Sequence, residues 1–455
     1  MAFITWKRDA VASKAQTTVP SVRMSPHSDQ PNSNDEWKRN TQPYYARASF
    51  MKMCLPALLY SVLLNSTLRV LSYVPFNSLM RIKPSILHPE DCFMIQNSSP
   101  PPIAVITGSN TGVGFETAQG LAQRGYHVVL ACRSRQKGLE AAEKINKHII
   151  AYSDADESKI AGKASFLQPL DLASFASIRS FCKAFSEKYD YLNVLVNNAG
   201  INSQGDVTED GLEMCFQSNF VGHFLLTKLL MPCLQNAKNT YRSNEYNDEA
   251  GRIVNLSSVT HHFAPSNERT HPNDDGSSDL SENNGIHDKQ FWLGSAMPGG
   301  STATYRESKL ASILFTMELN RRYGGEKGVR SVAVNPGSVS SDIWRNESEL
   351  TQKLYRMVYL TPKQGSSTSI AGSVGNIPTD AIYLQPYWQP TLFKRKMHSA
   401  IQSFERIYPL PFPMFEMLGP YISHSVTAPR LPADGCGGHK SAMQLWDVCE
   451  NLTAD

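Results

Sequence analysis

Residues 103–114 read Ile-Ala-Val-Ile-Thr-Gly-Ser-Asn-Thr-Gly-Val-Gly. A short apolar run that ends in a glycine-rich turn predicts a buried strand with a tight connection to a helix. That helix is expected over residues 115–124, and a second apolar strand over 126–131. Strand, glycine turn, helix and strand form the unit from which parallel, doubly wound sheets are built.

The same alternation continues along the chain. The expected strands are 193–196, 252–256 and 331–334, and the expected helices are 174–188, 211–234 and 305–323. The strands are continuously apolar, which indicates a sheet covered by helices on both faces. We therefore expect an α/β fold, a Rossmann-type doubly wound parallel sheet, in one catalytic domain over residues 100–455 with an N-terminal extension and two insertions.

The glycine-rich turn is a candidate ligand site, because ligands bind beyond the carboxyl ends of the strands in such sheets. Gly108, Gly112 and Gly114 lack side chains, so the backbone can approach a pyrophosphate whose charge faces the helix N-terminus. The alternative is an ordinary tight connection between a strand and a helix.

The end of the second strand distinguishes two dinucleotides. A site for NAD usually has an acidic residue there to hold the ribose hydroxyls, whereas this chain has Arg133. An arginine matches the charged 2′-phosphate of NADP, so NADP(H) is expected; the alternative is a solvated basic loop. Asp171, which closes the expected third strand after Phe166-Leu167, is expected to accept from the adenine amino group or, alternatively, to cap a helix.

Tyr305 and Lys309 lie four residues apart in a predicted helix, so their side chains share a face. A phenol titrates near pH ~10, and a neighbouring ammonium lowers that pKa toward the range in which protons exchange near neutral pH. Most tyrosine–lysine pairs at this spacing are surface contacts. Here the pair is in register with the glycine turn and the strand order, which favours a general acid/base.

Several motifs together carry a family resemblance. Thr107-Gly108-x-x-x-Gly112-x-Gly114, Asn197-Asn198-Ala199-Gly200, Ser258, Tyr305-x-x-x-Lys309 and Pro336-Gly337 resemble the short-chain dehydrogenase/reductase family. Finer motifs at 107–112, 131–133, 219–227, 254–262, 361–365 and 445–448 resemble its retinol dehydrogenase and WW-domain-oxidoreductase branch. The resemblance covers residues 100–385 and 434–455.

The resemblance implies an oxidoreductase that moves hydride between NADP(H) and a lipophilic alcohol or carbonyl of the retinoid, steroid or aldehyde class. It implies Tyr305 as general acid/base, Lys309 lowering the tyrosine pKa and holding the nicotinamide ribose, and Ser258 polarising the substrate oxygen. Asn219 would hold a water that links Lys309 to solvent, and Ser257 would point into the fold because neighbours in a strand face opposite ways. The implied cofactor contacts are Gly108, Ser109, Asn110, Thr111, Gly112, Val113, Gly114, Arg133, Asp171, Asn198, Ala199, Gly200, Tyr305, Lys309, Pro336 and Gly337.

Two other functions fit parts of the pattern. A light-dependent protochlorophyllide reductase shares the tyrosine–lysine pair, although Asn197-Asn198-Ala199-Gly200 and the histidines after Ser258 fit the retinol branch better. A non-catalytic NADP-binding regulatory or scaffold protein has usually lost the tyrosine, the lysine or the serine, and all three are present here.

Composition argues against several classes of protein. With 44 basic and 41 acidic residues the chain is near neutral, and no block of Lys and Arg suggests nucleic acid as a partner. The 8 cysteines are scattered, without a CxxC pair. That pattern argues against a zinc site and a disulfide framework and fits a reducing compartment, so no metal is expected.

Four segments lie outside the regular pattern. Residues 1–52 are polar and are expected to be disordered or a targeting segment. Residues 53–76 predict a membrane anchor or an amphipathic helix, which places the protein at a membrane (endoplasmic reticulum or another organelle) or in the cytoplasm. The insertion 266–290 is expected to be a solvated loop or a lid. The aromatic- and proline-rich insertion 386–432 is expected to cap the substrate pocket, rest on a membrane or add an apolar layer.

Overall fold

The structure is a computed structural model that describes residues 100–154, 162–203, 205–237, 250–264, 289–301, 304–325, 328–344, 348–375, 377, 381–387, 421–424 and 438–454. The expected targeting segment (1–52) and membrane anchor (53–76) lie outside the described residues, as do most of the insertions 266–290 and 386–432. Within these described ranges, no helix has the length and apolar character needed to cross a membrane.

The strands of the described part are β1 (Ile103–Thr107), β2 (His127–Ala131), β3 (Lys163–Phe166), β4 (Val194–Asn197), β5 (Arg252–Leu256), β6 (Arg330–Val334), β7 (Tyr383–Tyr387) and β8 (Tyr421–His424). The helices are α3 (Gly112–Ala122), α4 (Arg135–Asp154), α5 (Phe175–Lys188), α6 (Met214–Phe216), α7 (Gly222–Asn236), α8 (Lys289–Ala296), α9 (Thr304–Tyr323), α10 (Glu349–Val358), α11 (Pro362–Val374) and α13 (His439–Leu452). A π-helical turn, η4 (Gln217–Val221), joins α6 to α7, and η6 (Val259–Phe263) and η9 (Asp342–Trp344) are 3-10 turns.

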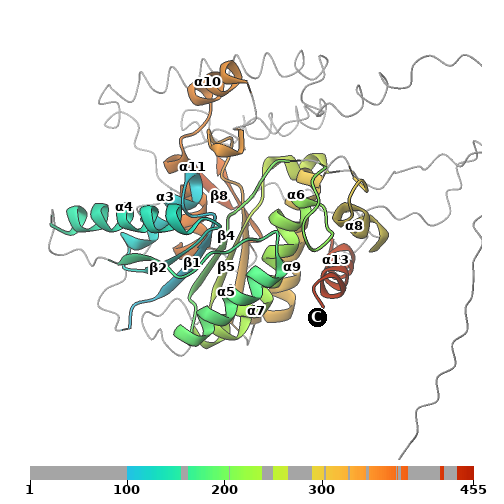
Figure 1. The fold of residues 1–455 in the computed structure, drawn as a ribbon, viewed down its shortest axis with the longest axis horizontal. Coiled ribbons are helices and arrows are strands. Elements are labelled where there is room, and N and C mark those ends of the chain that lie inside the picture. The colour runs from blue at the N-terminus through green and yellow to red at the C-terminus, as the bar shows by residue number, and fades with distance from the viewer. Residues whose placement is uncertain are drawn as a thin grey trace, which may run out of the picture. The chain divides into compact units, whose positions relative to one another are not determined.

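The described strands form one sheet in the order β3-β2-β1-β4-β5-β6-β7-β8 (Figure 1). Strands β1 to β7 run parallel, and β8 pairs antiparallel with β7. The chain builds outward from β1 in one direction and then returns to add β4 on its other side, so the strand order reverses between β1 and β4. This confirms the predicted doubly wound parallel sheet, whose ligands bind beyond the carboxyl ends at that switch point.

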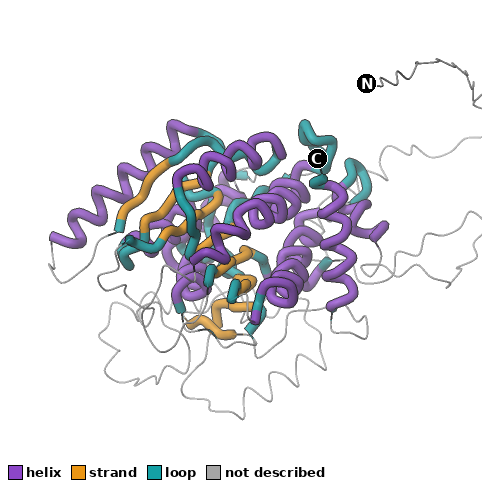
Figure 2. Tube along the Cα trace, turned by 90° about the horizontal axis from the view of Figure 1, so that it is seen from below, coloured by secondary structure: helices purple, strands orange, loops and turns teal. Residues whose placement is uncertain are grey.

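Helices cover both faces of the sheet (Figures 1 and 2). On β1, Ile103 and Val105 join an apolar core with α5, α7, α9 and α13, whereas Ala104 and Ile106 join a second core with α3, α4 and α11. Because both faces are buried, the strands are apolar at successive positions, as predicted. Full burial of each large aliphatic side chain contributes about 1.5–3 kcal/mol.

The helix predicted over 211–234 begins at Met214 and is interrupted by η4. Glu213 caps it, accepting a hydrogen bond from the Phe216 N–H (2.6 Å). In η4 the Gly222 N–H donates to the Gln217 carbonyl oxygen, five residues back. Such π turns widen a helix locally and are frequent at functional sites. Apolar periodicity alone predicts the helix but not this insertion.

Several elements go beyond the sequence prediction. Helix α4 is polar overall, yet Ala141 and Ile145 recur four residues apart on its buried face. Strand β7 reaches into the segment 386–432 and β8 lies within it, so part of this expected insertion extends the sheet. Helix α8 begins at Lys289, so the loop expected over 266–290 ends as a helix.

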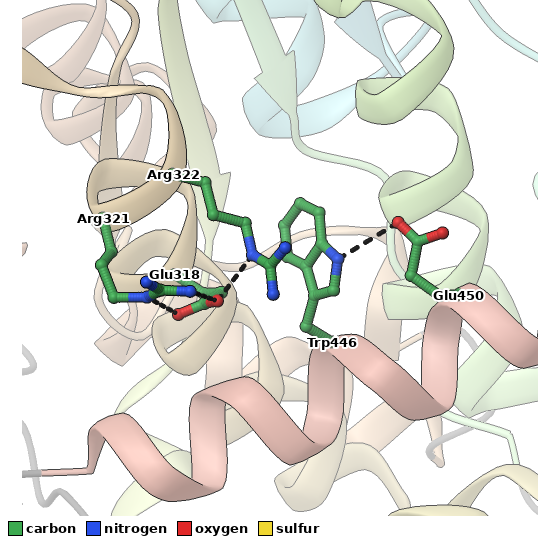
Figure 3. Close-up of polar contacts among 5 residues, drawn as sticks. All are labelled: Glu318, Arg321, Arg322, Trp446 and Glu450. Carbon is green, nitrogen blue, oxygen red and sulfur yellow. Dashed lines mark hydrogen bonds and ion pairs between the residues drawn. The ribbon is translucent and has the colours of Figure 1, made fainter.

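The C-terminal helix α13 is attached to α9 (Figure 3). The Arg322 guanidinium lies 4.4 Å from the centroid of the Trp446 ring, and Trp446 Nε1 donates to Glu450 (3.1 Å). Arg321 and Arg322 both donate to Glu318, whose side chain is 1% exposed. Burial alone would raise the pKa of Glu318, but the guanidinium hydrogen bonds outweigh it and lower the pKa. The near-terminal motif thus packs on the helix that carries Tyr305.

Candidate active site

The glycine-rich turn after β1 is held by close backbone contacts. Gly108 has a φ of 63°, and a Cβ there would lie 3.0 Å from Ala199 Cα. A Cβ at Gly114 would lie 2.5 Å from the Gly108 carbonyl oxygen, so α3 can start against the turn only because both residues are glycine. From the β4 side, Asn198 Nδ2 donates to the Thr107 carbonyl oxygen (2.7 Å). The turn and the segment 198–200, both predicted as cofactor contacts, therefore lie together at the switch point.

The first turn of α3 is suited to an anion. Its N-cap residue, Thr111, makes no side-chain capping bond, and its hydroxyl donates to Asp342 Oδ2 instead (3.0 Å). The leading N–H groups of a helix have no partner within the helix, and their partial positive charge favours a phosphate. Gly112 starts the helix with a φ of 61°, and Ser109 supports the turn by donating to the Ile106 carbonyl oxygen (2.8 Å). Asn110 and Val113, the other residues of the turn that are predicted to contact the cofactor, are half-buried.

Arg133 and Asp171 come together beyond β2 and β3. Arg133 Nη1 lies 3.9 Å from Asp171 Oδ2, and the Arg133 side chain is 80% exposed. Such an exposed ion pair stabilises the fold little, so the guanidinium is accessible to a ligand. Asp171 Oδ1 also accepts the Ala173 N–H (3.0 Å) and orders the turn before α5, whose N-cap is Ser174. Asp171 is therefore not the helix cap that was the alternative, because Ser174 has that role; its contact with the adenine stays a prediction.

Tyr305 and Lys309 share a face of α9, as predicted. The Lys309 ammonium lies 5.5 Å from the centroid of the Tyr305 ring. Lys309 is 4% exposed, and its Nζ donates to the Leu256 carbonyl oxygen at the end of β5 (3.1 Å). Burial lowers the pKa of Lys309 to about 8. The structure thus places a buried amine, whose pKa is lowered by burial, against the phenol ring.

Ser258 stands at the start of η6, which packs against α9. Its Oγ accepts the Thr260 N–H (3.2 Å), which leaves the hydroxyl proton to be donated elsewhere. Ser257 is buried and donates to the Lys309 carbonyl oxygen (2.7 Å). The two serines differ as predicted, because Ser257 holds β5 against α9 while Ser258 is only half-buried.

Asn219 lies in the π turn and joins β4 to α9. Its Oδ1 accepts the Ile201 N–H (2.8 Å), and its Nδ2 donates to the Ile201 carbonyl oxygen (3.0 Å) and to Ser308 Oγ (3.2 Å). A Cβ at Gly200 would lie 3.4 Å from Asn219 Oδ1 and 3.5 Å from Lys309 Nζ. The absent side chain therefore lets amide and ammonium approach the same glycine. The expected water link between Asn219 and Lys309 stays a prediction.

The Pro336-Gly337 turn follows β6 and leads to an aromatic segment. Gly337 has a φ of 81°, which favours glycine. Farther on, the Trp344 ring lies 5.1 Å from that of Tyr355, which stacks on Tyr359 with centroids 4.5 Å apart. Because Asp342 is bonded to the N-cap of α3, this segment is tied to the glycine-rich turn.

Known proteins share this arrangement of motifs. A family model for short chain dehydrogenases matches residues 102–269. Human retinol dehydrogenase 11 is 35% identical over 274 residues, which cover 60% of this chain and 72% of that protein. The chain belongs to the short-chain dehydrogenase/reductase family.

Within the short-chain dehydrogenases/reductases, it belongs to the retinol dehydrogenase-like branch. The chicken WW domain-containing oxidoreductase is 35% identical over 272 residues, covering 59% of this chain and 57% of that protein. Human polyprenol dehydrogenase is 34% identical over 281 residues, which cover 60% of this chain and 73% of that protein. The predicted family and branch are confirmed.

Two residues of this short-chain dehydrogenase site were not predicted from the sequence. Ser308 connects Asn219 with the backbone of Tyr305, since its Oγ accepts from Asn219 Nδ2 and donates to the Tyr305 carbonyl oxygen (2.8 Å). Asp342 contacts the N-cap of α3 from a segment 231 residues away, a pairing with no local signal. Among the residues that the structure describes, no group of His, Cys, Asp and Glu suits a metal ion. The described cysteines, all buried and free, are Cys132, Cys182, Cys215, Cys233 and Cys449.

Proposed function

We propose that the protein is an NADP(H)-dependent oxidoreductase that interconverts a lipophilic alcohol and its carbonyl compound by a Ser-Tyr-Lys mechanism assisted by Asn219. The observation that carries the proposal is the buried Lys309 ammonium against the Tyr305 ring, beside the turn that begins at Ser258. An arbitrary surface tyrosine–lysine pair would not bury its ammonium, because a buried charge needs a compensating role or partner.

The residues at the switch point fit a dinucleotide. Gly108 and Gly114 leave no room for side chains, and the first turn of α3 presents N–H groups that its N-cap does not bind. When bound, the nicotinamide supplies or accepts the hydride. The side chains proposed to hold the cofactor are Asn198 at the turn, Lys309 at the ribose and Arg133 at the 2′-phosphate.

In the reduction direction, the protein's own groups manage the substrate oxygen. The Ser258 hydroxyl donates a hydrogen bond to the carbonyl oxygen and stabilises the negative charge that develops there. Tyr305 gives its proton to the forming alkoxide. Lys309 makes the resulting phenolate easier to form, since an adjacent positive charge favours the ionised state. Alcohol oxidation follows the same steps in reverse.

The preference for NADP(H) rests on Arg133. Its guanidinium is exposed beyond β2, where a 2′-phosphate would lie, and Arg presents paired donors suited to phosphate oxygens. The weak ion pair with Asp171 leaves it able to rearrange toward a ligand.

The lipophilic substrate class rests on two supports. Two of the three relatives named above are a retinol dehydrogenase and a polyprenol dehydrogenase. In this chain, Trp344, Tyr355 and Tyr359 form an aromatic cluster in the segment tied to the glycine-rich turn. Stacked rings present apolar area with little conformational entropy to lose.

The test is nucleotide oxidation by the full chain with all-trans-retinal, a steroid ketone and a medium-chain aldehyde, each with NADPH and with NADH. We expect turnover of at least one carbonyl, faster with NADPH, and its loss in Tyr305→Phe. Equal, low turnover in both proteins with NADPH still bound would favour the scaffold function. Turnover of protochlorophyllide only under illumination would favour the other alternative.

Membrane association through residues 53–76 is part of the proposal. The stretch is mostly apolar, with Arg69 off-centre, and a spanning helix needs about 20 such residues. We expect the full chain to resist carbonate extraction from membranes and a variant lacking 53–76 to be released. Release of both proteins would contradict anchoring by this segment.

A further inference from the structure

A set of buried hydrogen bonds lies beneath the site. Thr107, the last residue of β1, is fully buried, and its Oγ accepts the backbone N–H groups of Asn198 and Ala199, each at 2.9 Å. The same oxygen lies 2.8 Å from Nε2 of His223. Nδ1 of His223 lies 2.9 Å from the Asn219 carbonyl oxygen. One imidazole ring therefore connects the end of β1 with the helix that carries Asn219.

The partners of His223 determine where its proton sits. A carbonyl oxygen can only accept, so Nδ1 carries the proton and donates to Asn219. In the neutral ring Nε2 then has a lone pair, which accepts the Thr107 hydroxyl. The other acceptor for that hydroxyl, the Val196 carbonyl oxygen, is farther away at 3.4 Å. Thr107 therefore receives two N–H groups and gives its only hydroxyl proton to His223.

A charged ring would disrupt this arrangement. Protonated Nε2 would direct a third donor at Thr107 Oγ, which already accepts two N–H groups. His223 is 3% exposed, and burial lowers its pKa to about 4. The geometry and the burial therefore favour the same neutral, Nδ1-protonated ring.

The π turn gives this ring a second role. A π turn shifts the regular pairing of helix carbonyls with N–H groups, and Asn219 lies within it. The Nδ1–H of His223 supplies a donor to the Asn219 carbonyl from one turn farther along. This hydrogen bond holds the backbone of Asn219, while the side-chain amide of Asn219 contacts Ile201 and Ser308.

We propose that His223 is a positioning residue for hydride transfer. Its neutral ring holds the Thr107 hydroxyl, and through it the backbone of Asn198 and Ala199, in the orientation that binds the nicotinamide cofactor. The inference rests on the proposed function, and His223 acts through Thr107 rather than on the reacting atoms. Without the ring, the Thr107 hydroxyl turns toward Val196 and the segment 198–200 loosens.

The first test compares two buried histidines. His127, the first residue of β2, is also buried, has a pKa lowered to about 4 by burial, and lies 2.8 Å from a hydroxyl, that of Ser165. It sits at the amino end of the sheet, opposite the site. We expect His223→Phe to raise the Kd for NADPH roughly 3- to 10-fold, the range of one net hydrogen bond, and His127→Phe to leave it unchanged. Equal effects in both variants, or none in His223→Phe, would overturn the proposal.

A double-mutant cycle with Thr107→Val tests whether His223 acts through that hydroxyl. If it does, the increase in Kd caused by Thr107→Val is smaller in the His223→Phe background than in the wild type. If the His223 ring only filled space, Thr107→Val would increase the Kd by the same factor in both backgrounds. That result would contradict the proposal.

A spectroscopic test on the full chain does not depend on turnover. Two-bond ¹H–¹⁵N spectra of protein labelled at histidine report the tautomer, and the His223 signal is assigned by its loss in His223→Gln. We expect a neutral ring protonated on Nδ1 that does not titrate between about pH 5 and 8, consistent with a lowered pKa. An Nε2-protonated ring, or titration near the usual pKa, would refute the positioning role. Absence of NADPH binding by the wild type, with the expected tautomer present, would instead refute the proposed function.

Discussion

The two halves of the sheet contribute different polar groups to the site. On the side of β1, β2 and β3, the polar groups offered to a ligand are backbone N–H groups in the first turn of α3 and the exposed Arg133. On the side of β4, β5 and β6, amides and hydroxyls are buried inside. Asn197 Nδ2 donates to Asn255 Oδ1 (2.8 Å), and Asn255 Nδ2 donates to Thr316 Oγ1 (2.9 Å) and Ser331 Oγ (3.1 Å).

Under the proposed function, this difference would separate cofactor binding from catalysis. A phosphate needs space, N–H groups and positive charge, which glycine and a helix start provide without a polar core. A proton-transfer group needs a fixed position, and a buried hydrogen-bond network fixes it because each member constrains the next. We therefore expect changes in the buried network of the β4–β6 half to affect chemistry and stability together, and a change at the exposed Arg133 to affect cofactor choice with little effect on stability.

The largest effect is expected at Lys309. Lys309→Met should reduce turnover at least about 100-fold, since the phenol loses the charge that favours its ionisation. The same change should raise the free energy of unfolding at pH 7 by on the order of 2 kcal/mol, because it removes a buried charge and loses one hydrogen bond. Turnover assays and urea unfolding measure both effects.

The pH dependence of stability checks the sign of the change that Lys309→Met causes in the free energy of unfolding. The pKa of Lys309 is lowered to about 8 in the folded state, so between there and its unfolded value the unfolded chain binds more protons. Wild-type stability should therefore rise with pH through that window, and Lys309→Met should lack this part of the rise. A less stable Lys309→Met protein at pH 7 would contradict the expectation.

Acid should destabilise both halves alike. His127 and His223 each have a pKa lowered to about 4 by burial, so both remain neutral in the folded state while the unfolded chain takes up protons below its usual pKa. The contribution of the two rings to stability is constant above about pH 6.5 and falls as the pH decreases toward 4, by on the order of 3 kcal/mol for each ring. Thermal unfolding between these pH values should show a smaller decrease in stability for His127→Phe than for the wild type, because only His223 then contributes to it.

Asn255→Leu tests the buried network of the β4–β6 half. It leaves Asn197, Thr316 and Ser331 without their shared partner, and unsatisfied buried groups cost about 1–3 kcal/mol each before relaxation. We expect a loss of about 3 kcal/mol in the free energy of unfolding. Thr316→Val, which removes one member only, should lose about 1 kcal/mol. A loss in Asn255→Leu no greater than in Thr316→Val would mean that the network does not act as a unit.

The smallest effect on stability is expected at Arg133, in the β1–β3 half. Arg133→Ala should raise the KM for NADPH about 10- to 100-fold, the range for a charged hydrogen bond, and leave the KM for NADH unchanged. The free energy of unfolding should change by less than about 0.5 kcal/mol because the side chain is exposed. An equal rise in the KM for NADPH and in the KM for NADH would show that Arg133 does not contact the 2′-phosphate.

The sequence pattern predicted what local periodicity and motif spacing encode. Strands such as 252–256, the Tyr305–Lys309 pair and the glycine turn were predicted because buried strands are continuously apolar and helical neighbours lie four apart. The π turn at Asn219 and the contact between Thr111 and Asp342 were not. The contact joins residues that are distant in the chain, and the π turn shifts a hydrogen bond by one residue without changing the apolar pattern.

The most direct test follows the hydride itself. The full chain would reduce its best carbonyl substrate with NADPH deuterated at both C4 positions of the nicotinamide, and mass spectrometry would weigh the alcohol formed. We predict an alcohol that carries one deuterium from the cofactor with the wild type, and almost none formed with Tyr305→Phe. An alcohol without deuterium, or equal yields from the two proteins, would contradict hydride transfer assisted by Tyr305.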